Sequence, residues 1–198
     1  MVEATAHRLK GVYVARTTET SQPRFESFLK NFGKSLGFLT TVRNIASTHV
    51  TLLESRGVKS RFYDSGFTPQ DVRQFSVDMQ RQIDKVRRSH SPIRVQVDPE
   101  QPFHVGIAQT RGKLALSVAS EQLQEERGII EAKLTDEFGT LPEMNQFDPH
   151  ITIGRISTGY LNRHEDLDPN SLIPDGLTVP SSVALNGLSV YLGGIHNH

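Results

Sequence analysis

The sequence predicts a mixed α+β fold built from two halves of similar design. Strand-like apolar runs alternate along the chain with stretches in which apolar residues recur every three or four positions. Each half has a strand, then a helix, then a strand that opens with His, an apolar residue and Thr. Val12 precedes His49 by 37 residues and Leu114 precedes His150 by 36. This agreement in order and spacing indicates an internal repeat.

The composition limits the classes of protein to which the chain can belong. The 198 residues fit a single domain spanning 1–198, long enough to bury a core. Lys plus Arg equals Asp plus Glu at 22 each, so the basic excess typical of proteins that coat duplex nucleic acid is missing. A small anionic substrate in a local positive pocket fits this balance. The chain has no cysteine, which excludes disulfides, Cys-ligated zinc and thiol catalysis.

The first half begins with a strand over 9–15, followed by a helix that opens at Pro23. The apolar stripe of that helix has helical spacing and consists of Phe25, Phe28, Leu29, Phe32 and Leu36. A β-prone stretch over 47–54 comes next. Thr68-Pro69 then marks the start of a second helix, with a capping hydroxyl before a proline, and Pro92 ends it.

The second half begins with strands over 93–97 and 103–108, which we expect to form a hairpin through the proline-containing turn 98–102. A strand over 112–119 leads into a helix capped by Ser120. The remaining elements are a strand over 150–156, a long polar loop over 157–181 and a last strand over 183–192.

Two short motifs contain the candidate catalytic residues. Of eight histidines, only His49 and His150 are followed two residues later by a threonine, Thr51 and Thr152, with apolar residues between and after. About 0.1 such motifs are expected by chance in this composition. Because side chains alternate along a strand, each strand would present His and Thr to one face and two apolar residues to the other.

Paired histidines suit phosphodiester cleavage. The reaction needs a base for the nucleophile and an acid for the leaving oxygen, and imidazole can serve as either because its ordinary pKa is about 6.5. The charge that develops on the phosphate needs hydrogen-bond donors. Two threonine hydroxyls and a protonated imidazole supply such donors without a metal.

The motifs resemble those of the two-histidine (2H) phosphoesterase superfamily, which includes 2'-5' RNA ligase-like proteins and 2',3'-cyclic nucleotide phosphodiesterases. Residues 147–155, Phe-Asp-Pro-His-Ile-Thr-Ile-Gly-Arg, are similar to the second motif of that family, and 48–53, Thr-His-Val-Thr-Leu-Leu, fit the first. The order of elements matches over roughly residues 8–192, whereas 157–181 matches no family pattern.

The resemblance implies a bilobal α+β fold, with two pseudo-symmetric lobes of antiparallel sheet and outer helices around a central cleft. The lobes would span 8–60 plus 183–192, and 93–160. It implies metal-independent hydrolysis of a 2',3'-cyclic phosphate or of short 2'-5' or 3'-5' linkages, with no cofactor. By analogy His150 is the base and His49 the acid, with roles that can exchange with substrate orientation, and Thr51 and Thr152 hold the phosphate oxygens.

The sequence leaves several alternative functions open. The same site would suit cyclic di- or oligonucleotide immune signals, as in phage members of the superfamily, or RNA end-joining. A non-catalytic module that binds a nucleotide or RNA end is the alternative outside enzymes.

Three further residues are candidates for substrate contact. Phe147 could stack on a base or pack in the core, and Tyr63 could meet a base or lie exposed in its loop. Arg155 would lie on the face opposite His150 unless the strand bulges. No metal-ligand spacing stands out, although His104, His196 and His198 could bind a metal weakly.

The expected setting is a cytoplasmic monomer. The polar N-terminus lacks a signal-peptide core, and no apolar run approaches the roughly 20 residues that span a bilayer. The expected partners are a nucleotide, a cyclic nucleotide or a short RNA, and no membrane.

Overall fold

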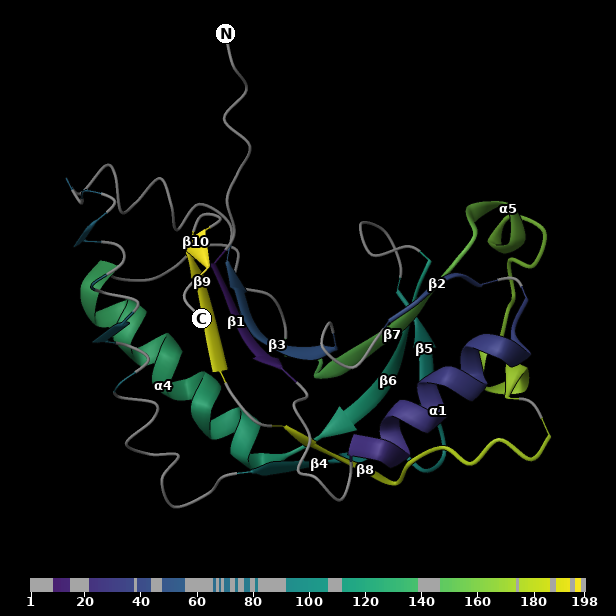
Figure 1. Ribbon diagram of the computed structural model, residues 1–198. Coiled ribbons are helices and arrows are strands. Elements are labelled where there is room, and N and C mark those ends of the chain that lie inside the picture. Colours follow the sequence, from purple (N-terminus) through teal and green to yellow (C-terminus); the bar gives the residue numbers. More distant parts are fainter. Residues whose placement is uncertain are drawn as a thin grey trace, which may run out of the picture.

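The protein has a mixed α+β fold in which antiparallel strands form one ten-stranded sheet that curls into a half-barrel (Figure 1). The structure is a computed structural model. It describes residues 9–14, 22–37, 39–43, 48–55, 66, 68, 70–71, 74, 77–78, 81, 92–106, 112–138, 147–173, 175–185, 188–192 and 195–196. Every strand pair within these residues is antiparallel.

The sheet brings the two halves of the chain together at its centre, where β3 pairs with β7. In spatial order its strands are β10 (Ile195–His196), β9 (Leu188–Leu192), β1 (Leu9–Val14), β3 (His49–Ser55), β7 (His150–Ile156), β6 (Lys113–Ala119), β4 (Ile93–Val97) and β8 (Ser182–Leu185). Two further strands extend it: β2 (Leu39–Val42) pairs with β7, and β5 (Phe103–Val105) pairs with β6.

Helix α1 (Gln22–Ser35) buries the apolar stripe that its sequence predicts. All five predicted members are buried: Phe25, Phe28, Leu29, Phe32 and Leu36. The rings of Phe28 and Phe32 lie 6.4 and 5.3 Å from that of Phe103, measured between centroids. Helix α1 therefore covers β5 of the second half, although it follows β1 of the first.

Helix α4 (Glu121–Phe138) likewise packs on a strand from the other half of the chain. It follows β6 of the second half but packs on β3 of the first, and Nη1 of Arg127 donates a hydrogen bond of 3.2 Å to the carbonyl of Leu52. Leu123 and Ile130 on this helix are buried. Each helix therefore supports strands from the other half of the sequence.

The prediction that residues 93–97 and 103–108 form a hairpin is wrong. Strands β4 and β5 do not pair with each other; both lie along the same side of β6. The segment 98–102 forms an insertion between them, in which the Asp98 carboxylate accepts hydrogen bonds from the backbone of Glu100 and Gln101, both at 2.9 Å. Prolines 99 and 102 lack the N–H groups that a continuous ladder needs, so the strand is interrupted there.

Three other elements differ from the expectation. The single strand over 183–192 is two strands, since β8 pairs with β4 and β9 with β1. Strand β2 was not expected. The loop 157–181 contains helix α5 (Thr158–Leu161) and a 3-10 turn over Pro169–Leu172.

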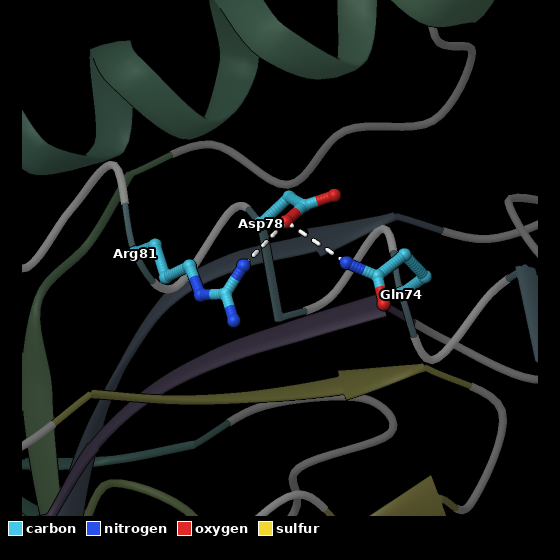
Figure 2. A network of polar contacts seen from close by, with 3 residues as sticks. All are labelled: Gln74, Asp78 and Arg81. Atoms are coloured by element: carbon cyan, nitrogen blue, oxygen red, sulfur yellow. Dashed lines mark hydrogen bonds and ion pairs between the residues drawn. The ribbon is translucent and has the colours of Figure 1, made fainter.

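Between residues 66 and 91 the structure describes only scattered positions, so most of the helix expected over 69–91 lies outside the described residues. Its predicted cap is present: the Thr68 backbone donates to the Asp71 carboxylate at 2.8 Å, and Asp71 N–H donates to Thr68 Oγ1 at 3.3 Å. Farther on, exposed Asp78 accepts hydrogen bonds from Gln74 at 3.0 Å and Arg81 at 3.4 Å (Figure 2).

No helix among the described residues is both long and apolar enough to cross a bilayer.

Candidate active site

The two His-x-Thr motifs meet where β3 and β7 pair. Val50 and Ile151, the middle residues of the motifs, are Cα partners in the antiparallel ladder. Continuing this register by one residue in each direction places His49 toward Thr152 and Thr51 toward His150. Since paired residues point to the same face, the four polar side chains share one side of the sheet.

Burial confirms the alternation expected for both motifs. Val50, Leu52, Ile151 and Ile153 are all 0% exposed, so they form the face covered by the helices. His49, Thr51, His150 and Thr152 are half-buried, so they stay accessible on the opposite face. The packing of the apolar residues therefore fixes the direction of the polar ones.

A backbone hydrogen bond sets the protonation pattern of His150. Its Nδ1 lies 2.8 Å from the carbonyl oxygen of Asp148. A carbonyl can only accept, so Nδ1 carries the proton and donates it. The neutral ring then presents an unprotonated Nε2, which is the form that can take a proton from a nucleophile.

His104 is a third histidine at the site that the sequence motifs do not identify. It pairs with Ala115 on β6, which pairs with Thr152 on β7, so it shares the face of the motif histidines. Its ring contacts that of His150 edge to face at 5.3 Å between centroids, and its Nδ1 is 2.9 Å from Ser117 Oγ. A signal for His104 in the sequence was its position between the apolar residues Phe103 and Val105 in a predicted strand, which directs its side chain to the face opposite theirs.

The surroundings favour the neutral form of His104. Burial lowers its pKa, and the nearby His150 lowers it further, while the Asp148 carboxylate acts in the opposite direction. A neutral imidazole beside His150 can accept a proton or a metal ion. His104, Asp148 and His150 each offer one such atom, and the three atoms lie within 4.8 Å of one another.

A β-bulge brings Arg155 to the histidine face. Ala115 pairs with Thr152 but Leu114 pairs with Gly154, so Ile153 is an extra residue on β7. The burial pattern then reverses: Arg155 is exposed and Ile156 is buried. The strict alternation that would have placed Arg155 opposite His150 therefore does not hold.

Arg155 pairs with Lys113 on β6, so two cationic residues lie side by side in the ladder. At about 3.3 Å per residue, Lys113 is two positions, roughly 7 Å, along β6 from Ala115, the partner of Thr152. Gly154 permits this arrangement, because a Cβ there would lie 3.0 Å from the carbonyl oxygen of Thr41 on β2.

The other two predicted contacts have different outcomes. Phe147 packs against the core, and the Arg127 guanidinium lies over its ring at 5.0 Å from the centroid. This arrangement corresponds to the packing alternative for Phe147. Tyr63 lies outside the described residues.

A cavity of about 750 Å³ lies away from the histidines, between α1 and residues 176–181. Phe28, one of its lining residues, packs on Phe103, whose side chain points to the sheet face opposite that of His104. The cavity is therefore on the helix side of the sheet and does not belong to the His-x-Thr site.

Comparison with known proteins finds a similar fold. No protein-family model matches the sequence, and a search of curated proteins finds no match. Among solved structures, the crystal structure of TT0787 of Thermus thermophilus is similar with a TM-score of 0.56 and 13% identity. The alignment covers 92% of this chain and 86% of TT0787.

The likeness to TT0787 is one of fold. The likeness extends over nearly the whole chain. A sequence identity of 13% supports a similarity of fold and nothing further.

Proposed function

We propose that the protein is a member of the 2H phosphoesterase superfamily and hydrolyses phosphodiesters by paired-histidine catalysis without a metal. The observation that carries the proposal is the antiparallel pairing of Val50 with Ile151, which brings both His-x-Thr motifs to one open face. The resemblance of both motifs to those of that superfamily supports it as well.

The proposed mechanism begins with His150. Its Nε2 removes a proton from water as the water oxygen attacks phosphorus, and the Nδ1 hydrogen bond to Asp148 holds the ring in the required tautomer. The bond from phosphorus to the leaving ribose oxygen breaks, and His49 donates a proton to that oxygen. The hydroxyls of Thr51 and Thr152 donate hydrogen bonds to the non-bridging oxygens, where negative charge increases.

The proposed substrates are 2',3'-cyclic phosphates and short 2'-5' or 3'-5' linked oligonucleotides. Arg155 and Lys113 favour a substrate with a second phosphate or an extended chain, because they lie on the same face beyond Thr152. The same feature suits the second candidate, cyclic di- or oligonucleotide signals. The equal numbers of acidic and basic residues favour short substrates over long duplexes.

The proposal includes a pseudo-symmetric, bilobal architecture. One lobe would centre on β3 and the other on β7, with the pseudo-dyad passing between Val50 and Ile151. The reciprocal crossing of α1 and α4 supports this, since each helix covers strands of the opposite half.

The test is turnover of 2',3'-cyclic nucleotides, 2'-5' dinucleotides and cyclic dinucleotides in EDTA by wild type, His49→Ala and His150→Ala. His164→Ala, an exposed histidine of the loop after α5, is the matched control. We expect turnover in wild type and the control only. Absence of turnover on every substrate, from folded protein, would replace the enzyme proposal with a nucleotide-binding module.

A further inference from the structure

Three potential metal ligands converge beside the proposed catalytic pair. His104 is on β5, His150 begins β7 and Asp148 precedes it, and one potential ligand atom from each lies within 4.8 Å of the others. The carboxylate is exposed and the two imidazoles are half-buried. Two histidines with one carboxylate are a donor set that zinc uses in proteins, with a fourth position left open.

Both rings are held as metal-binding histidines commonly are. Nδ1 of His150 donates to a backbone carbonyl at 2.8 Å, and Nδ1 of His104 is 2.9 Å from Ser117 Oγ. Such partners fix the orientation of the ring and, where Nδ1 is the donor, make Nε2 available to a metal. The ring orientations are therefore set before any cation arrives.

The donor atoms decide the class of cation. Imidazole nitrogens favour Zn²⁺, Co²⁺ and Ni²⁺, whereas Mg²⁺ and Ca²⁺ prefer sites made of oxygen. With two nitrogen ligands of three, the cluster fits a transition metal.

We propose that His104, Asp148 and His150 form a site for a divalent transition-metal cation, Zn²⁺ above all, and that the bound cation inhibits the protein. Inhibition follows because the cation occupies the lone pair of His150 Nε2 that must accept a proton. This second part rests on the proposed function, whereas cation binding does not.

The binding test uses full-length protein freed of metal with EDTA and then dialysed. Co²⁺ is titrated while its visible absorption is followed, and Zn²⁺ is titrated in a calorimeter, with wild type, His104→Gln, Asp148→Asn and the control His164→Gln. We expect one equivalent bound by wild type and by the control, and affinity at least about tenfold weaker in the other two variants. Equal affinity in all four proteins, or no binding to wild type, would overturn the site.

The inhibition test adds Zn²⁺ in stoichiometric steps to each protein and expresses turnover relative to the same protein without metal. Wild type should lose activity in parallel with the calorimetric binding curve, and His104→Gln should need at least about tenfold more Zn²⁺. Activation by Zn²⁺ would overturn the inhibitory role. If no protein turns over substrate in EDTA, the proposed function fails, while the Co²⁺ titration still decides the site.

Discussion

Val50 and Ile151 lie opposite each other in the antiparallel ladder between β3 and β7, and both are completely buried. They come from halves of the chain a hundred residues apart, yet their pairing determines where four polar side chains lie. A shift of one residue in this register would move the histidines to the covered face. The buried apolar pair thus positions the proposed site without being part of it.

Removing the threonine hydroxyls should slow the reaction without unfolding the protein. Thr51→Val and Thr152→Val keep the shape of the side chain but lose a hydrogen bond to the charged phosphate, which is worth about 1.5–3 kcal/mol. We expect kcat/KM to fall by roughly tenfold to a hundredfold in each variant. The control is Thr41→Val, an exposed threonine on β2. Equal rates in all three variants would exclude a role for the hydroxyls.

Arg155 should matter more for long substrates than for short ones. The ladder places it roughly 7 Å beyond Thr152, on the side away from His150, so we expect it to contact a neighbouring phosphate rather than the reacting one. We expect Arg155→Gln to raise KM for an oligonucleotide severalfold and to leave KM for a cyclic mononucleotide unchanged. Steady-state kinetics on both substrates, with the exposed Arg163→Gln as control, measures this. An equal effect on both substrates would contradict the placement.

Asn170 should stabilise the protein by joining the 3-10 turn after α5 to β5. Its side chain accepts a hydrogen bond from Phe103 N–H at 2.9 Å and donates one to the Phe103 carbonyl at 3.1 Å. Asn170→Ala leaves both groups beside a buried phenylalanine without these partners, so the free energy of unfolding should fall by about 1–3 kcal/mol. Urea denaturation with the exposed Gln101→Ala as control tests this. A change within about 0.5 kcal/mol would show that the contact is dispensable.

Buried Glu126 should make stability depend on pH. Glu126 is 3% exposed, on the same side of α4 as Leu123 and Ile130, and burial raises the pKa of its carboxyl to about 8. The folded protein therefore holds a proton that the unfolded chain releases at its ordinary pKa. This contribution to stability is complete below about pH 4.5 and is lost as pH rises through about 8, a change on the order of 3–5 kcal/mol.

The neutral isostere tests this linkage. In urea denaturation between pH 5 and 9, wild type should lose stability relative to Glu126→Gln as pH rises. Parallel profiles for the two proteins would show that the carboxyl is ionised in the folded state.

The features that the sequence predicts correctly are those set by local periodicity. The stripe of α1 needs only helical spacing, and the alternation of His-x-Thr needs only a strand. Both follow from residues within a few positions of each other. The matched spacing of the two motifs adds the one long-range inference that sequence permits.

The features that it misses depend on pairing between distant strands. His104 joins the site only because β5 lies beside β6 and β6 beside β7. Arg155 changes face through one extra residue at Ile153, which no pattern along β7 reveals. Glu126 occupies a position within the apolar stripe of α4, but its polar residue type alone would assign it to solvent.

The most direct test of the central claim is a double-mutant cycle on His49 and His150. Single-turnover rates on the best substrate are measured in EDTA for wild type, His49→Ala, His150→Ala and the double variant. If the two motifs form one site, each single variant loses about 10²–10⁴-fold, and the double loses little more than the worse single. A single variant that keeps the wild-type rate, or losses that simply multiply, would contradict a joint acid–base pair.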